Sequence, residues 1–233
     1  MMNRLRHHCS PLLRLFVFLL MLPSLLACAS KYISVNQIDS IDQVTINKIA
    51  IVPFGVDRMS SGESHDIAGE GAAVLTELVE TELNQFYYLI PREKVVLLLY
   101  KTGISDIQKI VTTLGSELDV DAVLMGIVTH YQSRKGNTYA ATEPASVAFE
   151  LYLISGKNSE LLWSASFDKT QKSLSEDVGN ITSFLQGEWR WLTTEELMER
   201  GVKQIVNKFP GMRQRKKLKK LKPLNPSLSS DTG

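Results

Sequence analysis

The sequence has very little cysteine: its 233 residues contain only Cys9 and Cys28. Every position after Cys28 therefore lacks a thiol for a disulfide, a zinc cluster or a cysteine nucleophile. The chain also lacks a P-loop, a dinucleotide-binding glycine pattern and an HExxH motif. We accordingly expect no cofactor, no metal site and no catalytic residues, and predict a protein that is not an enzyme. About 44% of the residues are hydrophobic, which is enough for an ordinary buried core without covalent cross-links.

Long hydrophobic runs are scarce as well. The apolar run at residues 15–22 is too short to span a membrane, because a spanning helix needs about 20 apolar residues. Arg4, Arg6 and Arg14 precede this run. A basic segment followed by a short apolar segment is typical of a secretory signal peptide. We therefore predict that residues 1–27 form a signal peptide.

The signal peptide ends in Leu25-Leu26-Ala27-Cys28, which resembles the bacterial lipobox. The resemblance implies cleavage before Cys28 and acylation of its thiol and amino group. Three acyl chains, at about 0.8 kcal/mol per buried methylene, would form a stable membrane anchor. Ala29 follows where lipoproteins of the inner membrane carry aspartate, so the resemblance implies the periplasmic face of an outer membrane. The alternative is an ordinary secreted protein in which this cysteine occurs by chance.

Charge is distributed unevenly, although the formal net charge is only +1. Between Cys28 and Met212 the chain carries 16 basic and 24 acidic side chains. The next ten residues contain seven basic residues and no acidic one. We predict that residues 212–233 form a disordered basic tail. The candidate contact residues in this tail are Arg213, Arg215, Lys216, Lys217, Lys219 and Lys220.

Basic runs often bind nucleic acid, but a periplasmic protein meets none, so no nucleic acid partner is expected. An anionic lipid surface, an acidic polysaccharide or an acidic neighbouring protein fits better, at about 1 kcal/mol per basic residue near an anionic surface. The alternative is a solvated tail without a partner. A second candidate contact is the pair Trp189 and Trp191, because tryptophan favours protein interfaces and membrane headgroups. One or both tryptophans could instead complete the core.

Hydrophobic periodicity predicts alternating strands and helices. Residues 28–45 are polar and read as a lipidated tether, and the domain is expected over residues 46–211. The order of elements predicts an α/β (α+β) sandwich with helices packed on a mixed sheet of about four to five strands. The predicted strands are 46–54, 87–90, 122–131, 146–154 and 161–168, and the predicted helices are 66–86, 91–99, 104–118, 174–185 and 193–209.

Two features make these predictions specific. Residues 146–154 and 161–168 form a predicted hairpin that places Trp163, Ala165 and Phe167 on one face. Thr193 and Glu196 have the spacing of a capping box, in which each side chain bonds the backbone amide of the other at a helix start.

Three segments of this pattern together resemble a known group of proteins. They are the strand sequence of residues 49–54, the segment of residues 114–126 with Leu114-Gly115 and Val120-Asp121-Ala122, and Glu160-Leu161-Leu162-Trp163 in the hairpin. The chain resembles the periplasmic α/β domain of the TolB amino-terminal kind. That group includes curli-secretion (CsgG-like) lipoproteins, peptidoglycan-synthase activator lipoproteins and Pel-polysaccharide secretion lipoproteins.

The resemblance implies a non-enzymatic envelope role through protein contacts, often within a homo-oligomer, and supplies no catalytic residues. Residues 55–65 and 132–145 are too short for the membrane-spanning hairpins of a curli-type pore. A synthase activator needs a long linker, whereas the predicted tether reaches about 60 Å at most. We therefore expect a self-associating accessory of an outer-membrane exporter of polysaccharide or protein. The alternative is a contact activator of a cell-wall (peptidoglycan) synthase.

Overall fold

The computed structural model describes residues 32–41, 44–57, 65–104, 106–171 and 190–221. The predicted signal peptide, the acylation site Cys28, the predicted helix at 174–185 and Trp189 lie outside these ranges. The same holds for the end of the predicted tail, residues 222–233.

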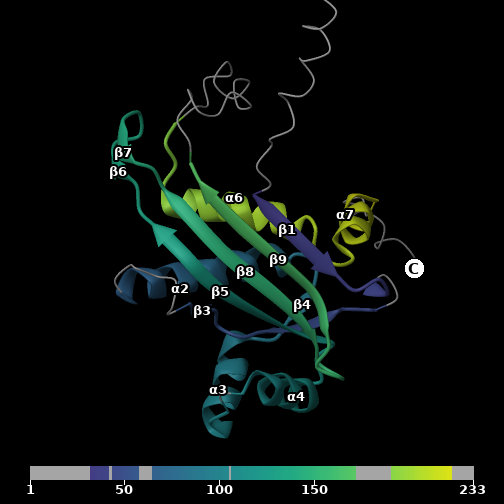
Figure 1. Ribbon diagram of the computed structural model, residues 1–233. Coiled ribbons are helices and arrows are strands. Elements are labelled where there is room, and N and C mark those ends of the chain that lie inside the picture. The colour runs from purple at the N-terminus through teal and green to yellow at the C-terminus, as the bar shows by residue number, and fades with distance from the viewer. Residues whose placement is uncertain (1–31, 42–43, 58–64, 105, 172–189, 222–233) are drawn as a thin grey trace, which may run out of the picture. The chain divides into compact units, whose positions relative to one another are not determined.

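The described chain contains a seven-stranded sheet and a separate two-stranded ribbon (Figure 1). The order across the sheet is β1-β9-β8-β5-β2-β4, and β3 pairs with β5 beyond the end of β2. The strands are β1 (Ile33–Gln37), β2 (Lys48–Ile51), β3 (Gly55–Val56), β4 (Tyr88–Leu89), β5 (Ala122–Gln132), β8 (Ser146–Ser155) and β9 (Leu161–Thr170), with β6 (Lys135–Gly136) and β7 (Ala141–Glu143) in the ribbon.

The sheet is mixed, which confirms the predicted fold class. Strands β2 and β3 run parallel to β5, and β4 runs parallel to β2. Strands β5, β8, β9 and β1 are successively antiparallel. The sheet has more strands than the four or five expected, because the residues of β1 and β3 have the composition of a polar tether and a loop.

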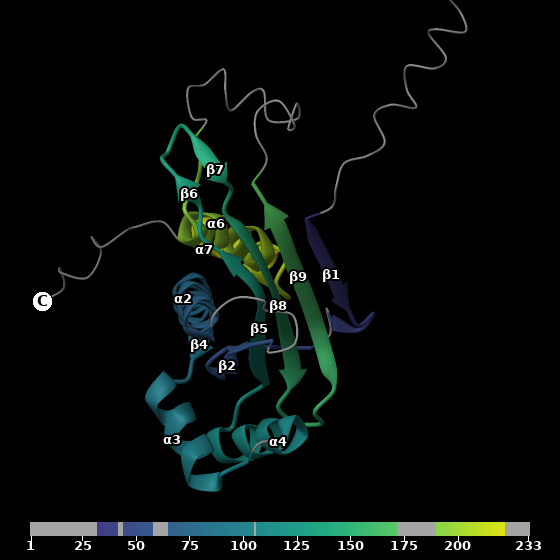
Figure 2. The same ribbon diagram turned by 60° about the vertical axis from the view of Figure 1, so that its left-hand side comes forward.

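Helices cover both faces of this sheet (Figure 2). On one face, α2 packs against α6 and β5, and α6 also contacts β8 and β9. On the other face, α3 contacts β2, and α4 contacts β5 and β8. The described helices are α2 (His65–Leu83), α3 (Arg92–Thr102), α4 (Ile107–Leu118), α6 (Thr194–Val206) and α7 (Met212–Leu221).

The main core lies between the sheet and helices α2 and α6, and a smaller core lies beneath α3 and α4. Trp163, Ala165 and Phe167 are all buried in the main core, which confirms the predicted face of the hairpin. Their neighbours on β8 alternate in the same way, because successive strand residues point to opposite faces. The main-core residues of β8 are Val147, Phe149, Leu151 and Leu153.

The predicted tether at 28–45 is wrong for residues 33–37, which form strand β1 at the edge of the sheet. All five residues pair with β9 in antiparallel register, from Ile33 opposite Phe167 to Gln37 opposite Trp163. Only one face of β1 is covered: Ile33 is buried, whereas Ser34 and Asn36 are exposed. The segment therefore reads as polar, although its period-2 alternation is that of a half-buried strand.

The predicted disordered tail is also wrong at its start, because residues 212–221 form helix α7. Met212 is fully buried in the main core and anchors the first turn. Lys, Arg, Gln, Leu and Met are all strong helix formers, and α7 consists of these residues alone. This composition was the sequence signal for a helix, but the high charge density indicated a solvated segment instead.

The start of α6 confirms the predicted capping box. The Thr193 hydroxyl accepts a hydrogen bond from the Glu196 amide at 3.3 Å, and the Glu196 carboxylate accepts one from the Thr193 amide at 2.9 Å. Two backbone amides that the helix leaves unpaired are thereby satisfied. Among the helices that the structure describes, none combines the length and apolar character that crossing a membrane requires.

Candidate functional site: a docked basic helix

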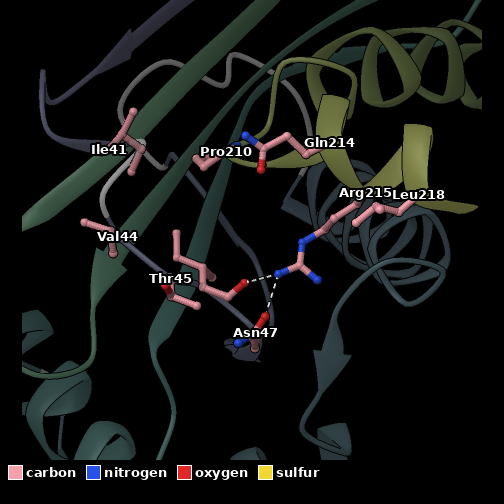
Figure 3. A pocket seen from close by; sticks show the side chains of 10 residues that line it. Ile41, Val44, Thr45, Asn47, Pro210, Gln214, Arg215 and Leu218 are labelled. Atoms are coloured by element: carbon pink, nitrogen blue, oxygen red, sulfur yellow. Dashed lines mark hydrogen bonds between the residues drawn. The ribbon is translucent and has the colours of Figure 1, made fainter.

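Helix α7 carries all six basic residues that the sequence singled out: Arg213, Arg215, Lys216, Lys217, Lys219 and Lys220. The chain enters the helix through Pro210 and Gly211, and Gly211 has a positive φ of 75°. Glycine adopts this left-handed conformation without steric cost. The turn sets the direction of α7 and brings it beside residues 41 and 44–47, which follow β1 (Figure 3).

Arg215 is the residue that fixes α7 to the body of the domain. Its guanidinium donates to the carbonyl oxygens of Phe86, at 2.9 Å, and of Ile46, and to the Asn47 side chain at 2.7 Å. Its carbon Cζ also lies 4.3 Å from the centre of the Tyr87 ring. Figure 3 shows the side chain pointing from α7 toward Asn47. A planar guanidinium with five donors suits this combination of carbonyl and aromatic contacts.

Tyr87 forms the floor beneath this arginine. Its hydroxyl donates to the Pro210 carbonyl, and its ring packs edge-on against Phe209 with centroids 5.3 Å apart. Burial raises the pKa of the Tyr87 hydroxyl to about 12, although the nearby Arg215 charge acts in the opposite direction. The phenol therefore stays protonated and keeps its hydrogen bond at any physiological pH.

Lys216 and Lys219 also belong to the docked side of α7. The Lys216 ammonium donates to the Asn207 side chain, and that of Lys219 donates to Gln85 at 3.4 Å. Both ammonium groups lie over the Phe86 ring, at 5.7 and 4.9 Å from its centre. Such cation–π contacts are worth about 0.5–1 kcal/mol at exposed sites. These two lysines therefore help to hold the helix and are not fully available to a partner.

Arg213, Lys217 and Lys220 form the free side of α7, which we name the basic stripe. Positions separated by four and then three residues lie along one face of a helix. All three side chains are exposed, and within the described ranges no hydrogen bond or ion pair occupies them. The structure thus divides the six predicted contact residues into three that dock the helix and three that face solvent. It presents the latter on a folded helix instead of a flexible tail.

A shallow cavity of about 360 Å³ lies next to the docked side of α7 (Figure 3). Ile41, Val44 and Thr45 line one wall, and Gln214 and Leu218 line the other. The wall residues are mixed in polarity and include no acidic side chain. The cavity therefore offers neither a catalytic pair nor a set of metal ligands. In the whole described chain, no three His, Cys, Asp or Glu residues gather as a potential metal site.

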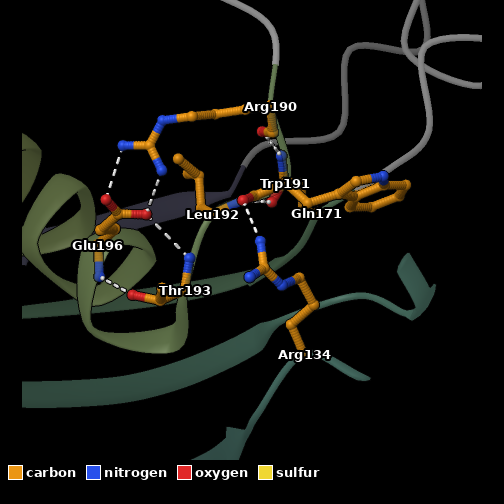
Figure 4. Close-up of polar contacts among 7 residues, drawn as sticks. All are labelled: Arg134, Gln171, Arg190, Trp191, Leu192, Thr193 and Glu196. Atoms are coloured by element: carbon orange, nitrogen blue, oxygen red, sulfur yellow. Dashed lines mark hydrogen bonds and ion pairs between the residues drawn. The ribbon is translucent and has the colours of Figure 1, made fainter. Parts of the chain in front are cut away.

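Trp191 is not the exposed contact that the sequence left open: it is 8% exposed, and it belongs to the body of the domain. Its backbone amide donates to the Thr138 carbonyl at 2.9 Å, and its carbonyl accepts from Arg134. Beside it, the Gln171 side chain donates to the Arg190 carbonyl and accepts from the Leu192 amide (Figure 4). The assignment of Trp191 as a contact residue is therefore corrected, whereas Trp189 lies outside the described residues.

Arg190 and Glu196 form an ion pair next to Trp191, with two guanidinium–carboxylate hydrogen bonds of 2.6 and 2.7 Å (Figure 4). The bonds from Arg190, together with the Thr193 amide, lower the pKa of Glu196 to about 2. The ion pair stabilises the first turn of α6, so both charged side chains have a structural role there. At neutral pH Glu196 is therefore ionised, as the ion pair with Arg190 requires.

Comparison with known proteins shows solved structures whose folds are similar to that of this chain. No protein-family model matches the sequence, and no curated protein matches it. A PelC dodecamer from Paraburkholderia phytofirmans has a TM-score of 0.44 and 13% identity, over 76% of this chain and 97% of that one. Lipoprotein GNA1162 from Neisseria meningitidis has a TM-score of 0.37 and 21% identity, over 61% and 96%. The LpoB C-terminal domain from Salmonella enterica has a TM-score of 0.33 and 15% identity, over 56% and 87%. At these scores, inference about function rests on the residues of this chain.

Proposed function

We propose that this chain is a lipid-anchored protein of the bacterial envelope that acts by contact and not by catalysis. In this proposal it is an accessory of a system that exports polysaccharide or protein, and it associates with copies of itself. Three features of the first 28 residues support the anchor: the basic segment, the short apolar run and the lipobox-like Leu25-Leu26-Ala27-Cys28. The acidic body and the docked basic helix support a role in binding an acidic partner.

The observation that carries the proposal is the early start of the sheet. Strand β1 begins at Ile33, so only four residues separate it from Cys28. However they are arranged, these residues let Ile33 lie at most ~17 Å from Cys28, at about 3.5 Å per residue. A chain acylated at Cys28 would therefore hold its domain directly against the membrane.

This short link also distinguishes the two candidate functions, the export accessory and the contact activator of a cell-wall synthase. An activator that reaches from the outer membrane to a cell-wall synthase needs a long, extended linker. The tether expected from the sequence already limited that reach, and β1 shortens the free link from 18 residues to four. The link therefore favours an accessory that works at its own membrane over an activator that works at a distance.

The basic stripe supplies the working surface in this proposal. Arg213, Lys217 and Lys220 project from a helix that Arg215 fixes to the domain. Because the helix is already folded, a partner need not restrict a flexible tail when it binds. The body between Cys28 and Met212 carries eight more acidic than basic side chains. An acidic polymer is therefore attracted to the stripe and repelled elsewhere.

An affinity measurement with polygalacturonate, an acidic polysaccharide, tests this surface. We compare the acylated protein with a triple variant, Arg213→Gln, Lys217→Gln and Lys220→Gln, over a salt titration. The triple variant should bind several-fold more weakly at low salt, and the difference should shrink at high salt because screening weakens exposed charges. Unchanged melting temperatures would show that the substitutions leave the fold intact.

The matched control removes the same charge from helices α3 and α4. Lys94, Lys101 and Lys109 are exposed there, and none of them forms a salt bridge with another described residue. The variant Lys94→Gln, Lys101→Gln and Lys109→Gln should bind polygalacturonate almost as well as the wild type. Equal losses in the two triple variants would mean that only net charge matters, and would refute a specific role for α7. The mass of the detergent-solubilised acylated protein tests self-association separately.

A further inference from the structure

The ribbon formed by β6 and β7 lies at the end of the sheet from which the chain leads back to Cys28. The amide of Asp168 in β9 donates to the Tyr32 carbonyl at 3.0 Å. Asp168 also pairs with Ala148 of β8, and Ala148 pairs in turn with His130 of β5. Tyr32 and His130 therefore lie at the same height along the strand direction of the sheet. Strand β1 begins at this level with Ile33, whereas β5 continues beyond it into the ribbon (Figures 1 and 2).

Chain length limits how far the acylation site and the ribbon can each extend from this level. Cys28 lies four residues before Tyr32, which allows at most ~14 Å in a fully stretched chain. Lys135, where the ribbon begins, lies five residues beyond His130, and the ribbon tip at Thr138 lies eight residues beyond it. At about 3.3 Å per extended residue, these positions are up to ~16 and ~26 Å away. Both views show the ribbon projecting past the start of β1.

The ribbon tip exposes a residue suited to a membrane interface. Tyr139 is 79% exposed, and tyrosine and tryptophan are enriched where headgroups meet water because they combine an apolar ring with a polar group. The Asn137 side chain accepts hydrogen bonds from the Tyr139 and Ala140 amides, at 2.9 and 2.7 Å. These bonds fix the backbone of the tip. Tyr139 is therefore held in place on an ordered turn.

Contacts with the body of the domain brace the ribbon. The Thr138 carbonyl accepts a hydrogen bond from the buried Trp191, and Arg134 donates to the Trp191 carbonyl. Just before the ribbon, the Gln132 carbonyl accepts a bond from the Thr194 hydroxyl at 3.2 Å. A ribbon of so few residues would be marginal by itself. These bonds explain how it can project from the sheet with a defined direction.

We propose that the β6–β7 ribbon is a second membrane contact, in which Tyr139 enters the headgroup region of the bilayer that holds the acylated Cys28. This inference rests on the lipid anchor of the proposed function. The link reaches at most ~14 Å and the ribbon projects past the start of β1, so the tip can meet the bilayer surface when the sheet stands upright on it. Lipid is favoured over a protein neighbour because the link itself holds this end of the sheet at the bilayer.

Two contacts at one end of the sheet would also orient the domain. Arg215 of α7 bonds Ile46 and Asn47, directly before β2, and Ile49 of β2 pairs with Ala122 at the start of β5. The docked helix therefore lies toward the end of β5 that is opposite the ribbon. With the ribbon on the bilayer, α7 lies toward the end of the sheet away from the membrane, where a soluble acidic partner can reach it.

Site-specific fluorescence on the acylated protein tests the contact. The mature chain has no free thiol if Cys28 is acylated, so Tyr139→Cys provides a single site for an environment-sensitive dye. The protein is reconstituted into vesicles of phosphatidylethanolamine and phosphatidylglycerol that contain a spin-labelled phospholipid. Tyr100→Cys is the matched control, because Tyr100 is 85% exposed on α3. Quenching by lipid should be several-fold stronger at position 139 than at position 100.

The outcomes separate this inference from the proposed function. Protein that fails to float with the vesicles would refute the lipid anchor itself. Protein that floats, but shows equal quenching at both positions, would overturn the ribbon contact and leave the anchor intact. A dye at position 139 that is shielded from an aqueous quencher but not quenched by lipid would place the ribbon against a second copy. That result would also overturn the proposal.

Discussion

The guanidinium of Arg215 covers the ring of Tyr87, at 4.3 Å from its centre, and donates to the neighbouring Phe86 carbonyl at 2.9 Å. This relationship explains why a run of six basic residues in ten adopts a defined position. Mutual repulsion would otherwise favour an extended, solvated segment. Arg215 offsets that repulsion by bonding to backbone oxygens and to a buried aromatic ring.

Replacing Arg215 should release α7. We expect Arg215→Ala to lower the free energy of unfolding by about 2–3 kcal/mol, because it removes charge-assisted hydrogen bonds to two backbone carbonyls. Urea denaturation measures this loss, and amide hydrogen exchange should show faster exchange along α7. Lys217→Ala, on the exposed side of the same helix, should change stability by less than about 0.5 kcal/mol. Similar effects of the two substitutions would contradict the docking role of Arg215.

Replacing Cys28 should abolish the membrane anchor. Cys28→Ala removes the thiol that the lipobox resemblance assigns to acylation, and no described helix could span a membrane in its place. We expect the variant to appear in the soluble periplasmic fraction, as measured by fractionation and immunoblotting. Retention of the variant in the outer-membrane fraction after a high-salt wash would show that the anchor lies elsewhere.

Trp163 tests the packing of the main core. It is fully buried, and its ring meets Phe209 edge-on with centroids 5.0 Å apart. Trp163→Ala should cost about 3–5 kcal/mol, the usual range for large aromatic truncations. Trp163→Phe should cost clearly less, because the indole N–H it removes has no partner in the described chain. Equal losses in denaturant titrations would mean that this N–H contributes to stability.

Gly115 tests the packing of α4 on the hairpin. A Cβ atom at this position would lie 1.9 Å from the Gly156 carbonyl oxygen. Gly115→Ala should therefore force the helix away from the turn and destabilise the protein by about 1–3 kcal/mol. The control is Gly69→Ala in α2, where a Cβ atom meets nothing within 4 Å. That change should stabilise the helix by up to about 1 kcal/mol, so thermal melting should shift in opposite directions.

Acid should weaken the start of α6 through Glu196. Its pKa is lowered to about 2, chiefly by hydrogen bonds from Arg190. A lowered pKa means that the ionised form stabilises the fold at pH values above the ordinary value near 4.5, and that this contribution fades as the pH falls toward 2. Stability measured between pH 6 and pH 2 should therefore fall more steeply in the wild type than in Glu196→Gln. Parallel pH profiles would contradict this role of the ion pair.

The sequence by itself determined most of the local elements. An apolar run located β5, and apolar alternation located β8 and β9. The spacing of Thr193 and Glu196 located the start of α6, because backbone periodicity and end-capping are set by neighbouring residues. The same patterns predicted the mixed sheet and the buried face of Trp163. The predicted lipid anchor at Cys28, the export role and the contact role of Trp189 stay predictions.

Only the tertiary structure decided which polar segments join the fold. Strand β1 resembles a tether because only one of its faces is buried, and the strand that pairs with it, β9, lies about 130 positions further along the sequence. Helix α7 looked like a tail because its docking depends on Arg215 and Ile46, which are 169 positions apart. Trp191 became a brace for the ribbon through Thr138 and Arg134. Local composition cannot encode such contacts, since each depends on where a distant backbone group lies after folding.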